Sequence, residues 1–248
     1  MKFHKKILLA LILLGVFVAS FLIGCGQKSE EPKKVRDLEF TVVQESELPE
    51  QLKLLIGEKK CNPFKLTYAG SDALYIVQGY GAQPTGAYSV TIQELWLAEN
   101  AIYFCSELLE PKEGARVEQR VSYPYVVVKM EWIDLPVVFE ADKNISFEGA
   151  RYRPGIYYSD IFLSEYILNL ELTVDRDCIK SVSITNLDEE ILSAYPLIEP
   201  SLQAISEQLI GGVAIDAITI SEDSKFTQMM LIEAIGIMLE RATLSTEK

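Results

Sequence analysis

The sequence predicts an α+β protein of two small domains, a β-rich first domain and a second antiparallel sheet packed by two helices. Short segments that alternate apolar and polar residues crowd between positions 65 and 139, and turn residues separate them. A second group of such segments, at 157–185, precedes two longer stretches with a helical apolar period. Strands followed by helices are typical of a sheet that helices cover on one face.

The N-terminus predicts a lipoprotein signal peptide over residues 1–24. Three lysines precede an apolar run from Ile7 to Ile23, and the run ends in Leu22-Ile23-Gly24-Cys25. This ending resembles the bacterial lipobox, whose cysteine receives acyl chains, palmitate among them. A transmembrane anchor is the alternative, but the run is at the short limit for ~30 Å of hydrocarbon and no basic cluster follows it. We therefore expect lipid on Cys25 and a location at the extracytoplasmic face of the cell membrane.

Cleavage before Cys25 changes the chemistry that the chain offers. The formal net charge is −13, and loss of the three lysines at positions 2, 5 and 6 lowers it to −16. Such an acidic chain repels nucleic acid, so nucleic acid is not an expected partner. The only histidine, His4, is lost too, which excludes Ser-His-Asp and Cys-His catalysis and histidine-ligated metals. We expect no catalytic residue, no metal and no cofactor.

The first domain is expected at 38–141, after a polar, flexible tether at 25–37. It starts with a strand at 38–43 and a short helix from Ser46 to Gly57, with Ser46 as the N-cap. Further strands are predicted at 65–68, 73–78, 88–97, 101–110, 123–129 and 137–139.

Residues 142–149 are typical of a boundary, and the second domain is expected at 148–245. Its strands are predicted at 157–162, 166–174 and 179–185. Its helices are predicted at about 189–211, interrupted near Pro196 and Pro200, and at about 226–242.

Three further cysteines, Cys61, Cys105 and Cys178, are too far apart in the sequence for a metal motif. One internal disulfide is open to them in an oxidising compartment. The preferred expectation is that they are reduced and mostly buried, where they pack as small apolar side chains.

A glycine-rich segment, Gly79-Tyr80-Gly81-Ala82-Gln83-Pro84-Thr85-Gly86-Ala87-Tyr88, joins two predicted strands. It does not fit a nucleotide loop, because Pro84 replaces a glycine of the dinucleotide fingerprint and a strand follows instead of a helix. On the residues alone, it is a tight connection whose glycines maintain a small β-fold.

Together with Ser122-Tyr123-Pro124-Tyr125, this segment resembles the C-terminal domain of PrcB-type lipoproteins over about residues 65–130. Ala87 departs from the family pattern, which has a second glycine there. The family's named example is an accessory lipoprotein of a surface protease complex. The resemblance therefore implies a binding or assembly subunit without catalytic residues. It also implies a protein partner, such as a protease. The expected partner-binding loop consists of Tyr80, Gln83, Pro84, Thr85 and Tyr88.

The second domain resembles, more distantly, the FMN-binding domains of flavoproteins. The resemblance lies in Tyr152-Arg153-Pro154-Gly155-Ile156-Tyr157, in Ile179-Lys180-Ser181-Val182, in Ala214–Ile218 and in Phe226-Thr227. Lys225 stands where that family has the threonine that bonds flavin phosphate, so a degenerate domain is expected. Thr219 and Thr227 are the substitutes that a flavin-carrying redox lipoprotein, the alternative function, would use.

Overall fold

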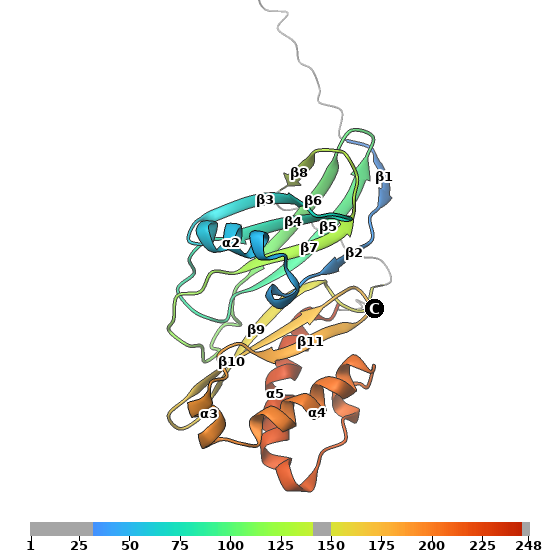
Figure 1. Ribbon diagram of the computed structural model, residues 1–248. Helices are drawn as coiled ribbons and strands as arrows, with labels where there is room; N and C mark the ends of the chain where they lie inside the picture. Colours follow the sequence, from blue (N-terminus) through green and yellow to red (C-terminus); the bar gives the residue numbers. More distant parts are fainter. Residues whose placement is uncertain (1–31, 141–149, 245–248) are drawn as a thin grey trace, which may run out of the picture. The chain divides into compact units, whose positions relative to one another are not determined.

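The computed structural model describes residues 32–140 and 150–244. The described residues from Lys34 onward cluster as one compact unit (Figure 1). Cys25, the predicted signal peptide and the predicted boundary at 142–149 lie outside the described residues. Within the described ranges, no helix combines the length and the apolarity that crossing a bilayer requires.

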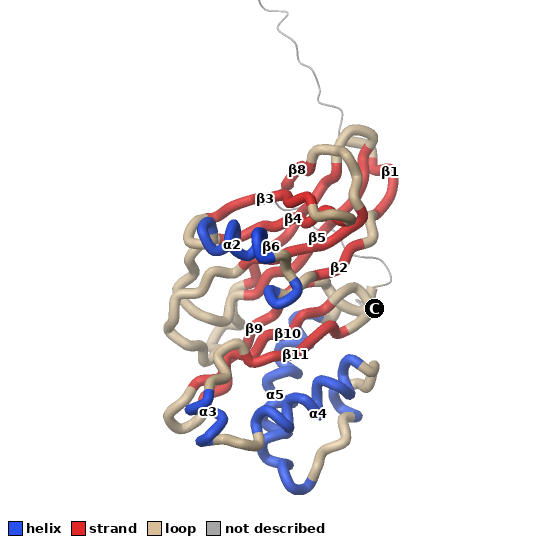
Figure 2. The backbone as a smooth tube through the Cα atoms, in the orientation of Figure 1, coloured by secondary structure: helices blue, strands red, loops and turns tan. Residues whose placement is uncertain are grey.

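Strands outnumber helices in the described chain, and most of the helices lie toward its C-terminal end (Figure 2). This mixture confirms the predicted α+β class. In chain order the elements are β1 (Lys34–Asp37), β2 (Phe40–Val42), the 3₁₀ helix η1 (Glu45–Glu47), α2 (Glu50–Lys59), β3 (Pro63–Ala69), β4 (Ala73–Tyr80), β5 (Ser89–Ala98), β6 (Ile102–Leu109), β7 (Tyr125–Glu131), β8 (Val137–Glu140), β9 (Gly155–Phe162), β10 (Ile167–Val174), β11 (Ile179–Ile184), α3 (Glu189–Ala194), α4 (Ile198–Ile210), the 3₁₀ helices η2 (Ile215–Ala217) and η3 (Glu222–Ser224), and α5 (Lys225–Ala242).

The strands form two sheets. The smaller sheet has four antiparallel strands in the order β2-β7-β4-β3. The larger sheet has seven strands, in the order β11-β10-β9-β5-β6-β8, with β1 paired to β5. Strands β6 and β8 run parallel, whereas β5 runs antiparallel to β1, β6 and β9.

The four-stranded sheet is covered on both faces, and β4 shows how its sequence permits this. Alternate side chains of a strand point to opposite faces. Leu74 and Ile76 therefore enter the core between the two sheets, where they join Val90 and Phe104. The other face of the sheet packs against α2.

Tyr75 and Val77 of β4 belong to a separate core that includes Leu52 and Ile56 of α2. The two faces of β4 are thus both apolar and both buried. This explains a run of apolar residues in β4 that is nearly continuous instead of alternating.

Strands β9, β10 and β11 form the antiparallel meander that the sequence predicts, and α4 and α5 pack against it. Its core joins Leu170 and Leu172 of β10 to Ile205 of α4 and to Ile235 and Met238 of α5. The meander is not a separate sheet, because β9 pairs with β5 and so extends the larger sheet. We call this pairing the β5–β9 seam.

Gly155 makes the seam possible. A Cβ atom at this position would lie 2.3 Å from the carbonyl oxygen of Val90, far inside ordinary contact distance. Glycine is the residue that lets two backbones approach this closely. The sequence pattern predicted strands on each side of the predicted boundary. It did not predict that β5 pairs with β9, because the close contact joins Val90 and Gly155, which are 65 positions apart in the sequence.

Two local differences from the sequence prediction have simple physical reasons. The last four residues of the predicted tether form β1, whose side chains are all exposed, so no apolar period marks it; its backbone pairs with the edge of β5. The predicted helix from Ser46 is divided into η1 and α2 at Pro49, which precedes the first α-helical residue. Gln44, not Ser46, is the N-cap residue of η1.

The predicted interruption of the next helix is confirmed. Helix α3 ends at Ala194, and α4 begins at Ile198 with Pro200 in its first turn, where a missing N–H costs no helical hydrogen bond. The expectation of mostly buried cysteines is wrong for two of the three: Cys61 and Cys178 are exposed, and Cys105 is buried in β6. Cys61 and Cys178 lie in turns outside the cores, next to the ends of α2 and β11.

Candidate partner-binding site

The connection between β4 and β5, residues 81–88, has a backbone that only certain residues permit. Gly81 has φ of +74°, and a Cβ atom there would lie 2.8 Å from Pro63. Just before it, a Cβ atom at Gly79 would overlap the ring of Phe64 at 2.1 Å. The glycines therefore satisfy a positive φ and a close packing contact, as the sequence reasoning expected.

A second irregular segment, residues 117–124, holds this connection in place. Gln83 and Ser122 exchange two backbone hydrogen bonds, of 2.8 and 3.0 Å. The Ser122 hydroxyl donates to the carbonyl oxygen of Thr85 at 2.6 Å. The N–H groups of Tyr80 and Gly86 donate to the carbonyl oxygens of Pro124 and Glu118 at 3.0 and 3.3 Å. Hydrogen bonds to residues 117–124 thus hold the connection in a fixed conformation.

The five predicted loop residues divide into two groups. Tyr80, Gln83 and Thr85 are half-buried and serve the fold: the Tyr80 hydroxyl lies 2.8 Å from Ser106 Oγ, and Gln83 Nε2 donates to the Tyr80 carbonyl at 3.0 Å. Pro84 is exposed, and Tyr88 is half-buried at the wall of a pocket. Pro84 and Tyr88 are therefore the members that a partner can reach most directly.

The pocket beside Tyr88, which we call the Tyr88 pocket, has a volume of about 350 Å³. Its walls come from the connection, from the segment that braces it, and from β9 and β10. Its lining residues are Glu45, Lys60, Gly86, Tyr88, Arg120, Val121, Ser122, Tyr123, Pro124, Tyr125, Tyr158, Asp160, Asn169, Leu170, Glu171 and Thr185. Three features stand out: four tyrosines, an exposed Val121, and charged groups of both signs.

A polar network fixes one side of the Tyr88 pocket. Asp160 Oδ2 accepts the Glu118 N–H at 2.8 Å, and Asp160 Oδ1 accepts Asn169 Nδ2 at 2.9 Å. Asn169 Nδ2 also donates to Glu118 Oε2 at 2.8 Å, and Arg120 Nε donates to the same oxygen at 2.9 Å. Burial alone would raise the pKa of Glu118, but the hydrogen bonds from Arg120 and Asn169 outweigh it and hold that pKa below its ordinary value.

A group of phenols and carboxyls forms another part of the wall of the Tyr88 pocket. The Tyr125 hydroxyl donates to Glu45 Oε2 at 3.1 Å. Burial raises the pKa of Tyr125, and burial likewise raises that of Tyr158. The pKa of Glu171 is raised by burial and by the charge of Glu45, while a hydrogen bond from Tyr158 lowers it. These phenols stay protonated at neutral pH and act as hydrogen-bond donors instead of bases.

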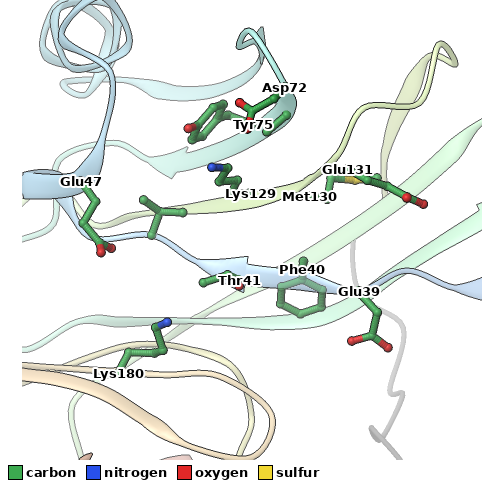
Figure 3. A pocket seen from close by; sticks show the side chains of 12 residues that line it. Glu39, Phe40, Thr41, Glu47, Asp72, Tyr75, Lys129, Met130, Glu131 and Lys180 are labelled. Carbon is green, nitrogen blue, oxygen red and sulfur yellow. The ribbon is translucent and has the colours of Figure 1, made fainter.

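A separate, larger pocket of about 620 Å³ opens at β2, β4 and β7. Figure 3 shows its charged side chains coming from separate elements, with Lys129 next to the ring of Tyr75. Glu131 pairs with Arg36 at 2.7 Å, and Lys180 lies 3.9 Å from Asp175. No predicted site residue lines this pocket. Across the described ranges, no three acidic, cysteine or histidine side chains come together as a metal site.

The two threonines that a flavin would need lie apart from these pockets. Thr219 is exposed, and its N–H donates to Gln208 Oε1 at 2.9 Å. Thr227 is half-buried in the first turn of α5. Neither lines the pockets that contain Tyr88 and Lys129. Cys25, the predicted lipidation site, lies outside the described residues.

Residues 74–131 match the model of the family described as PrcB C-terminal. This region is therefore similar to PrcB-type C-terminal domains. No curated protein and no solved structure matches the chain. The match extends from β4 to β7, so it contains the connection, its bracing segment and the Tyr-Pro-Tyr sequence that opens β7. The resemblance expected over about 65–130 is confirmed, although β3 precedes the matched residues.

The PrcB-type region does not form the Tyr88 pocket alone. Tyr158, Asp160, Asn169 and Glu171 belong to β9 and β10, outside the match. Sequence reasoning missed these four residues, because each lies alone among strand residues and no motif links them to the glycine-rich segment. The alternation within β10 indicates which of its residues share a face, but not that this face meets residues 117–124.

Proposed function

We propose that this protein is a lipid-anchored extracytoplasmic lipoprotein that acts as a non-catalytic binding or assembly subunit, with a secreted protease as its protein partner. The match of residues 74–131 to the PrcB C-terminal family carries the proposal. The lipobox-like sequence before Cys25 supports the anchor. The absence of histidine after residue 4 supports a role without acid–base catalysis of the usual kinds.

The geometry supports protein binding at the Tyr88 pocket. Tyrosines combine a large apolar ring with a hydroxyl, and interfaces are enriched in them. Val121 is 51% exposed at the pocket, and Pro84 is exposed on the braced connection. Because hydrogen bonds already fix both segments, a partner would order few side chains on binding, which lowers the entropic cost.

Co-purification from native membranes tests the proposal. We expect a protease to be recovered with the wild-type protein, and we expect Val121→Glu to reduce that recovery about tenfold, because it places a carboxylate at the interface. The matched control is Leu54→Glu on α2, since Leu54 is 69% exposed and lines neither pocket. Recovery of the wild-type protein alone from several mild detergents would contradict the proposed partner.

The anchor has its own test. Cys25→Ser should abolish incorporation of radiolabelled palmitate and leave the protein uncleaved, because the thiol is the acceptor of the lipid. Cys61→Ser, at an exposed cysteine, should leave labelling unchanged. Labelling of the Cys25→Ser variant would show that lipid attaches elsewhere.

A further inference from the structure

A third cavity, which we call the α5 pocket, has a volume of about 450 Å³. Segment 111–117, β9 and α5 form it, and it shares Tyr158 and Asp160 with the Tyr88 pocket. Its size falls within the range of roughly 300–1,000 Å³ that is typical of small-ligand sites. Ala87, Val117, Phe162 and Ile237 give it apolar walls. Ala87 is the position at which this chain departs from the family's glycine, so its methyl group is an additional apolar contact.

Three positively charged side chains line the α5 pocket, and two of them already bind oxygen atoms of the protein. Arg241 is half-buried and donates to the carbonyl oxygens of Tyr158, Leu109 and Glu110 at 3.2 to 3.4 Å. Lys112 forms an ion pair with Glu240. Arg241 and Lys112 therefore chiefly fix segment 111–117 to β9 and α5.

Arg116 is the third cation, and its position differs. Its guanidinium lies 3.9 Å from the centroid of the Phe162 ring. A cation–π contact of this kind does not occupy the N–H donors of the guanidinium, which remain available for hydrogen bonds. Within the described ranges, Arg116 has no ion pair with a carboxylate.

The carboxylates at the α5 pocket do not neutralise Arg116. Both oxygens of Asp160 accept hydrogen bonds, from the Glu118 N–H and from Asn169. Glu240 is paired with Lys112. Glu113 is exposed in the segment that contains Gly114, which has φ of +77°. In a chain with a net charge of −13, an arginine beside an apolar cavity thus remains available for an anion.

We propose that the α5 pocket binds a carboxylate carried by an apolar group the size of a leucine or phenylalanine side chain. Arg116 pairs with the carboxylate in bidentate geometry, and Val117, Phe162 and Ile237 contact the apolar group. Two sources present this chemistry: the C-terminal residue of a peptide, and a free carboxylic acid such as 3-phenylpropionate. The proposal does not depend on the partner proposed above, because the site contains its own recognition groups.

Isothermal titration calorimetry on the protein purified from membranes in a non-ionic detergent tests it with three probes. They are acetyl-Ala-Ala-Phe with a free carboxylate, the same peptide as its C-terminal amide, and 3-phenylpropionate. We expect the peptide acid to bind and the amide to bind about tenfold or more weakly, since a hydrogen bond to a charged group is lost. Stronger binding of the peptide acid assigns the site to a chain terminus, and equal or stronger binding of 3-phenylpropionate assigns it to a free acid.

The variants separate recognition from folding. Arg116→Gln should weaken binding of the peptide acid about tenfold or more, and Arg116→Lys should restore part of the loss, because it keeps the charge without the planar fork. Ile237→Glu should weaken binding by placing a like charge at the apolar wall. The matched control is Arg151→Gln, since Arg151 also lies over an aromatic ring, 5.1 Å from that of Tyr152, but outside the α5 pocket.

Circular dichroism spectra identical to the wild type would show that each variant is folded. Equal binding of acid and amide, no binding of either carboxylate, or a folded Arg116→Gln variant with unchanged affinity would each overturn the proposal. Loss of the protease partner without loss of peptide binding would bear on the proposed function alone.

Discussion

Replacing Gly155 by alanine tests the β5–β9 seam. The new methyl group would lie 2.3 Å from the Val90 carbonyl oxygen and 2.8 Å from Thr91 Cα, whereas ordinary contacts begin at 3.4 Å. The two backbones must therefore separate by about 1 Å. Two hydrogen bonds cross the seam beside this point, from the Ile92 N–H at 2.8 Å and the Thr91 hydroxyl at 3.1 Å, both to the Pro154 carbonyl.

Overpacking of this kind costs about 1–3 kcal/mol, and each weakened hydrogen bond adds up to about 1 kcal/mol. We therefore expect Gly155→Ala to lower the free energy of unfolding by about 2–4 kcal/mol. For a domain of this size that corresponds to a fall in Tm of roughly 5–15 °C.

Thermal unfolding followed by circular dichroism measures the effect. The matched control is Gly57→Ala on the exposed surface of α2, where no atom lies within 4 Å of the new Cβ. That substitution should raise the free energy of unfolding, by up to about 1 kcal/mol, because alanine favours a helix interior. A Tm for Gly155→Ala within about 1 °C of the wild type would refute the close approach. A continuous sheet also predicts one cooperative transition, and two well-separated transitions would favour the predicted division near 142–149.

Two further predictions concern the walls of the Tyr88 pocket. Asn169→Leu removes the amide that bridges Glu118 and Asp160, and we expect it to lower the free energy of unfolding by about 1–3 kcal/mol in urea titrations. The control Gln203→Leu, on the exposed face of α4, should change the free energy of unfolding little. Equal effects of the two substitutions would contradict the bridging role of Asn169. Glu171 has a folded-state pKa raised above 4.5, chiefly by burial, so the stability that it contributes is full below that value and is lost as the pH rises through the folded-state pKa. Glu171→Gln should therefore be more stable than the wild type at about pH 7.5 and similar to it near pH 4, and an advantage that does not change with pH would argue against the raised pKa.

The sequence predicted the elements of the fold better than their partners. All the strands expected between 65 and 185 are present within a few residues, because apolar alternation and turn residues are local signals. The pairing of β5 with β9 depends on a glycine that fits against a distant carbonyl, and no local pattern encodes that fit. Strand β1 was not predicted, because its side chains are all exposed and its sequence therefore has no apolar alternation.

The candidate site was predictable only in part, for a similar reason. The glycine-rich segment and the Tyr-Pro-Tyr sequence carry a recognisable family pattern, and both lie at the Tyr88 pocket. The pattern did not tell which loop residues face inward, because Tyr80 and Gln83 are held by hydrogen bonds to Ser106 and to the backbone. Arg116 has no motif at all; its significance comes from Phe162, a residue 46 positions later.

Strand β1 also shortens the tether through which the proposed lipid on Cys25 would hold the protein. Ordered pairing begins at Lys34, so eight residues separate Cys25 from the folded body instead of the twelve that the predicted tether would supply. A fully extended chain spans at most ~3.6 Å per residue, so lipid on Cys25, as proposed, would keep Lys34, where the folded body begins, within about 30 Å of the bilayer. A soluble enzyme bound to it would then stay near the membrane surface, where substrates that are themselves attached to the membrane are concentrated.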